Sequence, residues 1–384
     1  MAEKKKQHFV PKFYMSLFAN SNKEFAVYNI EKRMCAYPVP YKNQCSKDYF
    51  YGKDGVWENK LSDLESKWAD AFRLALERRA LSEEQIDLLK QFALYQRQRT
   101  SGQYIFMKKQ RCELLIEYGK SIYANNGLIF DEKAKAICVE RAAEEIAPAE
   151  NLQHIDKFTN IVSDMGLIII NYQTKGRLIS SDVPVIAINP FHKPTIGYGC
   201  MGLILLFPIS PNHLVVIYDK KMYPRFNDKL YVNITNENEV KNLNALQLSS
   251  AEKILFAYDP CDFHCFSTTA WKNRTISRES PTLQTLGSDT QKLIGTDLRK
   301  TVFLCEFSFG KMQNHFSKIP FSCREAVPRI WEQGWEDKLK SKIDLLPQIS
   351  EHTPTMLTTM KLTKKECRNG LREMLAAAKA YWGR

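Results

Sequence analysis

The chain has 384 residues, of which 44% are hydrophobic and 26% are charged, and this composition is that of a globular protein with a buried core. Its longest apolar runs, such as GLIII and GLILLF, are too short to span a bilayer, so we expect no membrane partner. The basic start, MAEKKKQHF, lacks the apolar stretch of a secretory signal. Ten cysteines are scattered without a disulfide-like framework, which favours a cytoplasmic protein with free thiols.

The net charge is +12, and such an excess favours polyanions as partners, nucleic acid first. The lysines and arginines are spread along the chain, and the densest run of them near the start is Lys4–Lys6. A generally basic protein would show the same distribution. The charge therefore leaves two interpretations open, a nucleic-acid surface and a basic protein without one.

The first part of the chain predicts a mixed segment. The stretch VPKFYMSLFAN can form a short helix with Pro11 in its first turn, where a missing N–H does no harm. EFAVYNI alternates like a strand. The following stretch up to Lys53 is rich in Tyr, Pro, Asn and Gly, and we expect it to be a loop.

Helical spacing follows. From Glu58 onward, apolar residues recur every three or four positions and predict a helix with one apolar face. A capping-box pattern at Ser82 then starts a helix that we expect to continue to about Tyr123, because Gly102 is the one weak helix former in its path. A further helix is expected at 131–147.

The next region is rich in short apolar runs separated by turn residues, which is typical of strands. The strand candidates are MGLIIINY, RLISSDVPVIAIN, MGLILLFPIS, HLVVIYD and LYVNIT. The stretch NENEVKNLNALQLSSAEKILFAY then returns to helical spacing.

This order of elements predicts an α+β fold, with helices and strands segregated rather than alternating. We expect a core domain at 1–260, in which a helical part at 58–147 packs as a layer on a mostly antiparallel, β-rich part at 153–260. Residues 261–384 are expected to form a loop-rich and helical C-terminal extension.

Five polar residues lie where the surrounding pattern asks for apolar ones: His8, Glu65, Gln96, Arg99 and Asp182. Glu65 lies on the apolar face of its helix, and Gln96 and Arg99 are three apart on one face of the next. Asp182 interrupts an apolar run just before Pro184, which places it at a strand end. Because burial of such groups without partners costs several kcal/mol, we expect the five to converge, as a satisfied network or around a cleft.

Catalysis on phosphodiesters would use these side chains directly. Glu65 and Asp182 would share a divalent cation, Mg²⁺ or Mn²⁺, that polarises phosphate oxygens and activates water. Arg99, with Gln96 beside it, would stabilise phosphate charge. His8 would act as an acid or base near neutral pH.

Structural roles explain the same residues without chemistry. Glu65 and Arg99 would form an internal ion pair that bridges two helices, with Gln96 in the same bridge. Asp182 would close an Asx-type turn. A lone histidine such as His8 is more often structural than catalytic, and a buried network of this kind can fix a unique core.

Several known signatures are missing from the sequence. It contains no Walker loop, GxGxxG fingerprint, GxSxG elbow or HExxH, so it carries no nucleotide cofactor motif. The compact cluster of Cys261, His264 and Cys265 in DPCDFHCF has no fourth ligand at definite spacing nearby, so ordinary thiols are favoured over zinc.

Several of these segments together resemble a known family. QHFVPKFYMSLFA is similar to the HYVP-type opening of a bacterial family of unknown function, domain-of-unknown-function family 4238, with Phe9 in place of the usual tyrosine. The Glu of LSDLESKW, the Gln and Arg of YQRQRT, SSDVPV, FPISP and the helix around Asn244 continue the resemblance over roughly residues 5–260. The resemblance implies no established activity. It implies that the five polar residues belong to one recurring constellation.

Two main function classes follow from these residues. The first is a nuclease-like enzyme acting on RNA or DNA phosphodiesters, in the setting of a bacterial defence or toxin effector. The alternative is a non-catalytic binding or regulatory module with a buried polar network. An enzyme on a small phosphorylated or nucleotide ligand is a third class.

The end of the chain, 331–384, is expected to contact a partner, either nucleic acid or a protein. Two helices are predicted there, at 330–345 and 363–381. Trp331, Trp335 and Leu339 are four apart and form an apolar stripe flanked by lysines, which suits phosphates or a protein groove. Packing on the chain's own core would explain the stripe equally well.

Overall fold

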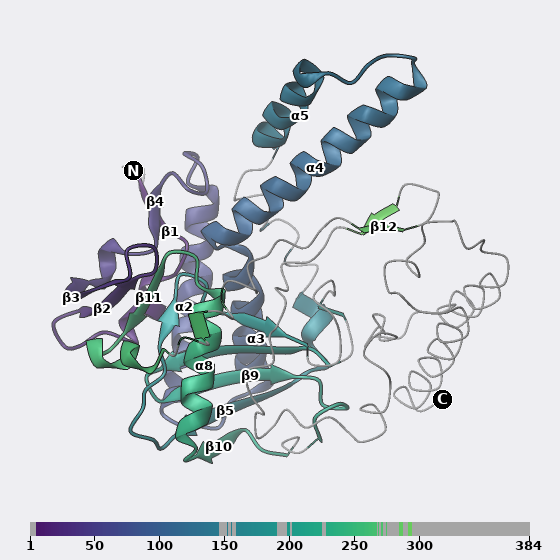
Figure 1. Ribbon diagram of the computed structural model, residues 1–384. Coiled ribbons are helices and arrows are strands. Elements are labelled where there is room, and N and C mark those ends of the chain that lie inside the picture. Colours follow the sequence, from purple (N-terminus) through teal and green to yellow (C-terminus); the bar gives the residue numbers. More distant parts are fainter. Residues whose placement is uncertain are drawn as a thin grey trace.

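A computed structural model gives the arrangement of the chain (Figure 1). It describes residues 5–145, 152, 155, 159–189, 198–199, 202–224, 228–266, 268, 270–271, 274, 284–286 and 291–293. The two helices predicted near the C-terminus, with the Trp331 stripe, lie outside the described residues. Within the described residues, no helix is both long enough and apolar enough to cross a membrane.

The N-terminal segment folds around a short helix. Helix α1 (Lys12–Ser16) follows Pro11, which is its N-cap in an extended conformation. Strand β1 (Lys6–His8) lies before it and pairs antiparallel with β4 (Ser46–Asp48). This pairing brings both ends of the first 50 residues together.

The expected loop up to Lys53 is wrong, because this stretch contains β3 (Met34–Pro40), the 3-10 turn η1 (Tyr41–Asn43) and β4. Strand β3 is exposed along most of its length and holds two prolines, so it has no alternation for a sequence pattern to detect. It is an edge strand that pairs with β2 (Glu24–Asn29), the strand predicted from EFAVYNI.

A four-stranded sheet joins segments that are far apart in the sequence, in the order β3-β2-β11-β6. Strand β11 (Ile254–Ala257) pairs antiparallel with β2 on one side and with β6 (Ser180–Ser181) on the other. The helical spacing expected for the whole stretch NENEVKNLNALQLSSAEKILFAY is therefore wrong at its end. Helix α8 (Glu237–Ser250) stops before β11, a short buried apolar run whose type periodicity cannot decide.

A five-stranded sheet forms the larger β layer, in the order β10-β5-β9-β8-β7. The strands are β5 (Gly166–Tyr172), β7 (Ile186–Ile188), β8 (Ile204–Ser210), β9 (His213–Tyr218) and β10 (Tyr231–Ile234). All neighbours pair antiparallel except β10 and β5, which are parallel.

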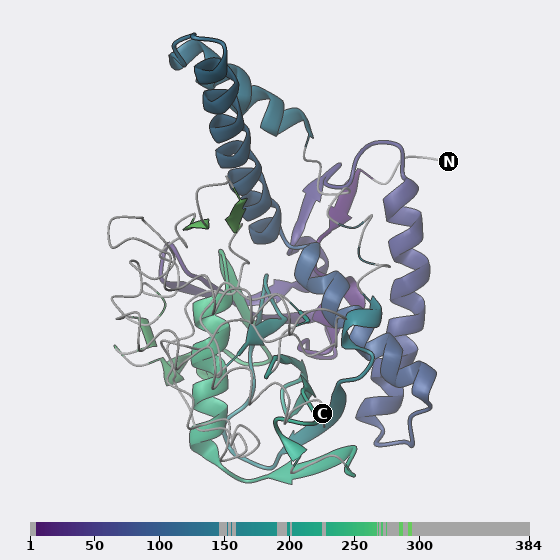
Figure 2. The same cartoon turned by 90° about the vertical axis from the view of Figure 1, so that its right-hand side faces the viewer.

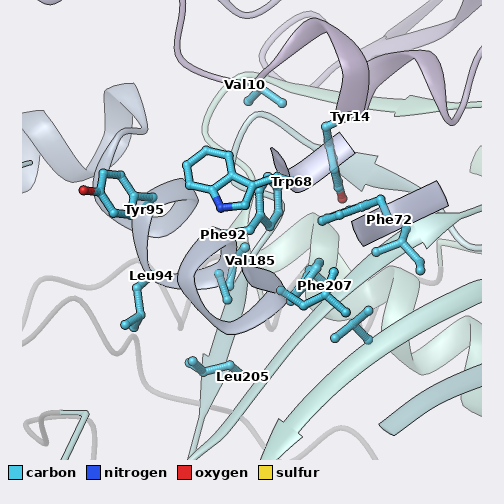
Figure 3. Close-up of a cluster of buried hydrophobic side chains, with 14 of the residues drawn as sticks. Val10, Tyr14, Trp68, Phe72, Phe92, Leu94, Tyr95, Val185, Leu205 and Phe207 are labelled. Carbon is cyan, nitrogen blue, oxygen red and sulfur yellow. The ribbon is translucent and has the colours of Figure 1, made fainter. Parts of the chain in front are cut away.

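Two helices pack on this sheet through aromatic side chains (Figure 3). Helix α2 (Val56–Leu76) places Phe72 with its ring centroid 6.0 Å from that of Phe207 on β8, and α3 (Glu83–Gln98) places Phe92 at 5.4 Å from the same ring. Trp68 lies edge-on to Phe92 in the same cluster. The predicted α+β fold, helices on a mostly antiparallel β layer, is confirmed.

The expected helix from Ser82 to about Tyr123 is interrupted. The capping box of Ser82 and Gln85 is present, but α3 ends at Gln98 and α4 (Ser101–Asn125) begins anew. The reason is a second N-cap that the sequence analysis missed, because the hydroxyl of Thr100 accepts the N–H of Gln103 at 3.2 Å.

Helices α4 and α5 (Glu132–Glu145) form an antiparallel pair that projects from the rest of the molecule (Figures 1 and 2). We call residues 101–145 the arm. The helical layer expected at 58–147 is therefore too long, since its second half leaves the sheet.

Candidate functional site

Arg99 is the centre of a buried polar network at the end of α3. Its Nε donates to the hydroxyl of Tyr51 at 3.1 Å, and its Nη2 donates at 2.7 Å both to Oε1 of Glu65 and to the carbonyl of His8. The residue is 2% exposed. Burial works against its charge, but the neighbouring Tyr51 and Glu65 outweigh burial and raise the pKa of Arg99, so it is a permanent cation.

Gln96, one turn earlier on α3, continues the network along the same segment. Its Nε2 donates to the carbonyl of Phe9 at 2.9 Å, next to the His8 carbonyl that Arg99 binds. The N–H of Phe9 donates in turn to the carbonyl of Cys45 at 2.9 Å. The end of α3 therefore fixes the main chain of QHFVP from one side and the β1-β4 pair fixes it from the other.

His8 uses its ring for a main-chain contact. Its Nε2 lies 3.0 Å from the carbonyl of Lys42, and since a carbonyl only accepts, Nε2 carries the proton. Burial lowers the pKa of His8 to about 4, the bond to Lys42 raises it in part, and the charges of Lys12, Lys6 and Arg99 lower it further. The imidazole is thus neutral at pH 7.

Asp182 caps a different part of the fold. Its Oδ1 accepts the N–H of Glu252 at 2.8 Å, and its Oδ2 accepts those of Lys253 at 2.7 Å and Ile254 at 3.4 Å, where β11 begins. Burial raises the pKa of Asp182 to about 6, against the opposing effect of these bonds. The pKa of the buried Cys45 thiol is raised by burial and then by the charge of Asp182.

Four of the five predicted residues are therefore joined by hydrogen bonds around residues 8 and 9, namely His8, Glu65, Gln96 and Arg99. Within the part of the chain that the structure describes, Asp182 makes no hydrogen bond to these four. Cys45 is close to both, since its carbonyl accepts the N–H of Phe9 and its thiol is near enough to Asp182 for the carboxylate to raise the pKa of the thiol. Among the described residues, no three His, Cys, Asp or Glu side chains gather as a metal site. The shared Glu65–Asp182 cation stays a prediction, as do the catalytic roles.

Two buried atoms of the network have no hydrogen-bond partner within the described part of the chain. They are Oε1 of Gln96 and Nη1 of Arg99, an acceptor and a donor three residues apart. Such groups are uncommon in protein interiors, because each carries the cost of lost hydration. Glu65 is the most accessible member of the network, with 26% of its side chain exposed.

The sequence analysis missed Tyr14, which joins three of the segments on which the family resemblance rests. Its hydroxyl donates to the carbonyl of Pro208 in FPISP at 2.6 Å, and because its single proton is then used, it accepts from the hydroxyl of Ser180 in SSDVPV at 2.9 Å. Tyr14 itself lies in QHFVPKFY and is fully buried. A tyrosine inside an apolar stretch gives no signal of its own, since its ring satisfies the pattern.

Two amides of α8 make a similar junction. Asn244 accepts the N–H of Ile179 at 3.1 Å and donates to the carbonyl of Arg177 at 2.8 Å. Gln247 accepts from the hydroxyl of Ser181 at 2.9 Å and donates to the carbonyl of Pro184 at 2.8 Å. The resemblance pointed to this helix, but the helical pattern alone did not reveal these partners.

Exposed lysines lie near these junctions. Lys6 and Lys12 are close enough to His8 for their charges to lower the pKa of its ring. Burial lowers the pKa of Lys47, and the charge of Lys253 lowers it further. Lys47 lies on β4 opposite Gln7 of β1, and its Nζ donates to the hydroxyl of Ser101 at 2.7 Å. Lysines therefore gather around β1 and β4, where Asp48 pairs with Lys5 at 3.3 Å.

The Cys261 cluster shows another arrangement. Cys261 is an exposed free thiol in the 3-10 turn η4 (Pro260–Cys265). Asp259 and Asp262 form a capping box for this turn, and Oδ1 of Asp262 binds Nε of Arg177 at 3.0 Å. These contacts give Asp259 and Asp262 structural partners in the turn.

A family model described as "Protein of unknown function (DUF4238)" matches residues 6–260, so the resemblance seen in the sequence is confirmed. Neither the curated proteins nor the solved structures include a match to this chain.

Proposed function

Because the chain belongs to the DUF4238 family of proteins of unknown function, whose description assigns no activity, we propose from its own residues that it is a non-catalytic binding module for nucleic acid. In this proposal the buried polar residues hold the fold together, and lysines around β1 and β4 bind phosphates. The protein acts in the cytoplasm, where its free cysteines stay reduced.

One observation carries this choice. The hydrogen bonds of His8, Gln96 and Asp182 end on main-chain groups, and Arg99 also binds the carbonyl of His8. Bonds of this kind stabilise the main chain whether or not any reaction takes place, so a structural role is sufficient to explain these side chains.

Phosphate binding is supported by the charge around β1 and β4. The lysines there, exposed and within electrostatic reach of each other or of His8, are Lys6, Lys12, Lys47 and Lys253. Lysines in such a group attract a polyanion and release its counterions on binding. The net charge of +12 favours the same partner.

A nuclease is the second candidate, and the unpaired atoms of Gln96 and Arg99 favour it. In this alternative, Nη1 of Arg99 would donate to a phosphate oxygen after the network opens at the partly exposed Glu65. Glu65 and Asp182 would hold Mg²⁺ or Mn²⁺, and the protein would serve as a defence or toxin effector that cuts RNA or DNA.

Binding is tested by fluorescence anisotropy with short labelled RNA and DNA at several salt concentrations. We expect the logarithm of the binding constant to fall linearly with the logarithm of the salt concentration. The double variant Lys47→Gln/Lys253→Gln is expected to reduce the steepness of this line by about 1–2, because two phosphate contacts are lost. Lys135→Gln, on the arm, is the matched control and leaves the slope unchanged. Binding without salt dependence, or no binding, contradicts the proposal.

Cleavage separates the two candidates. The same labelled strands are incubated with the protein with and without Mg²⁺ or Mn²⁺, beside the conservative variants Glu65→Gln and Asp182→Asn. The binding module leaves the strands intact. Products that form with wild type and disappear with folded Glu65→Gln and Asp182→Asn establish the nuclease instead.

A further inference from the structure

The arm carries most of the large apolar side chains that the molecule exposes. Of the eleven such side chains in the described part, seven lie between residues 105 and 139. Tyr118 and Ile122, four apart on one face of α4, are 66% and 42% exposed. At the tip, Leu128 and Ile129 are 60% and 87% exposed. Single exposed apolar residues are normal on a protein surface, but a group of them marks an interaction site.

These side chains are not needed to hold the arm itself together. The inner face of the arm is closed by other contacts, where Phe130 and Cys138 meet α4 so closely that a Cβ on Gly119 would lie 2.7 Å from the ring and 3.1 Å from the sulfur. Tyr123 packs edge-on to Phe130 with ring centroids 5.5 Å apart. Tyr118, Ile122, Leu128 and Ile129 are therefore exposed near the tip of a helix pair that is already packed.

The charge of the arm distinguishes between partners. Residues 101–145 contain seven Lys/Arg and seven Asp/Glu, in a chain whose net charge is +12. A neutral apolar surface does not attract nucleic acid or an anionic lipid surface, both of which select clustered lysines and arginines. It suits a surface of the same kind, and the arm of another copy has that surface.

We propose that the arm is a dimerisation element, in which the α4-α5 pairs of two copies pack through Tyr118, Ile122, Leu128 and Ile129 into a four-helix bundle. A two-fold axis makes such a contact self-complementary, because each copy offers the same patch. The bundle buries apolar side chains that are exposed in one copy and drives association through the hydrophobic effect.

The shape of the arm keeps the charged bodies apart in this dimer. Helix α4 has 25 residues and at about 1.5 Å per residue extends roughly 37 Å, whereas the Debye length in physiological salt is about 8 Å. Contact near the tips therefore joins two neutral surfaces and keeps the described core of each chain, from which the arm projects, beyond strong repulsion. The proposal does not rest on the proposed nucleic-acid binding.

The test is the mass of the full-length protein in solution, measured by light scattering after size exclusion and by sedimentation. Wild type is expected at twice the 44.5-kDa chain mass. Ile129→Lys and Tyr118→Lys weaken the dimer at least about tenfold and give the single-chain mass, with circular dichroism unchanged. Met34→Lys, at a side chain that is 63% exposed but lies on β3, is the control and stays dimeric.

Cross-linking identifies what covers the arm. In a mixture of light and isotopically heavy copies, links between Lys120 and Lys135 are expected to join one light and one heavy chain. A wild type with single-chain mass at high concentration overturns the proposal. So do arm variants that remain dimeric, a monomer whose arm lysines link to residues 331–384 of the same chain, and a monomer that binds anionic vesicles through the arm.

Discussion

Nη2 of Arg99 donates to Oε1 of Glu65 across 2.7 Å, from the end of α3 to the middle of α2. The two side chains differ in environment, since that of Arg99 is 1% exposed and that of Glu65 is 26% exposed. The pair thus extends from the interior to the surface, and the carboxylate balances a cation that cannot lose its proton. Loss of the carboxylate would leave the buried guanidinium of Arg99 without its anionic partner.

Replacing Arg99 by Met is expected to lower the free energy of unfolding by about 1.5–3 kcal/mol, because it removes charge-assisted hydrogen bonds to buried groups. Glu65, which is 26% exposed, can still be solvated in the variant. The variant also leaves the carbonyl of His8 and the hydroxyl of Tyr51 without the bonds they make to the guanidinium. Urea denaturation gives the value. The control is Arg73→Met, which removes an exposed pair with Glu77 at 3.2 Å and costs about 0–1 kcal/mol. Equal losses in the two variants would show that Arg99 is not a buried clamp.

The sequence predicted the helices better than the contacts of their polar residues. The apolar spacing of α2 and the capping box of α3 depend on residues close together in the chain, so both were predicted correctly. The burial of Gln96 and Arg99 also followed from their place on an apolar face. Of their partners, only Glu65 was anticipated, as the ion pair with Arg99. The carbonyls of His8 and Phe9 were not, because main-chain groups carry no sequence signal.

Asp182 does not join the other four polar residues, although the sequence predicted that all five would meet. A polar residue in an apolar run has to find partners, but the run does not say which. Its partners are three N–H groups at 252–254, reached because β6 and β11 pair in the smaller sheet. The pairing joins segments some 70 residues apart, and β11 had been expected to be helical. Because the segment of β11 was predicted to be helical, nothing in the sequence indicated that Asp182 binds its main chain.

Tyr14→Phe is expected to destabilise the protein by about 1–3 kcal/mol with no change in fold. The substitution keeps the ring and removes one hydroxyl, so the buried carbonyl of Pro208 and hydroxyl of Ser180 lose their partner. Thermal unfolding followed by circular dichroism measures the loss. Tyr37→Phe, at an exposed tyrosine of β3, is the control and is expected within about 0.5 kcal/mol of wild type. A Tyr14→Phe protein as stable as wild type would mean that the junction is not important for stability.

The pH dependence of stability is expected to reveal His8. Its pKa is about 4 in the folded protein and 6.5 ordinarily, so between these values the unfolded chain binds the proton more readily. This contribution to stability is present above pH 6.5 and is lost as the pH falls toward 4. Asp182 has the opposite sign, because its folded pKa of about 6 exceeds its ordinary 3.8 and its contribution is lost as the pH rises through 6.

His8→Gln separates the two effects. The glutamine amide can still donate to the carbonyl of Lys42, while the titrating ring is gone. Unfolding free energies are compared for both proteins at pH 7 and pH 5. Wild type is expected to lose unfolding free energy between pH 7 and pH 5 through His8, and the variant is expected to lose less or to gain. The reason is that protonation of Asp182 stabilises the folded protein over this range, and in the variant no histidine at position 8 opposes it. Identical pH dependence in the two proteins would contradict a lowered pKa at His8.

Gly119→Leu is expected to separate α5 from α4 and to leave the remaining described structure folded. A Cβ at this position already lies 2.7 Å from the ring of Phe130, and the rest of a leucine would enter the space that the ring and the Cys138 sulfur occupy. The start of α4 contacts the core, where the ring centroid of Tyr104 lies 6.3 Å from that of Phe50, and the part of the arm around Gly119 projects away from it (Figures 1 and 2), so we expect the effect to stay local. Hydrogen exchange followed by mass spectrometry is the measurement, with faster exchange expected at 132–145 and unchanged exchange in α2. Ala124→Leu, at an exposed position of the same helix, is the control and exchanges like wild type. Faster exchange in α2 as well would show that the arm and the core unfold as one unit.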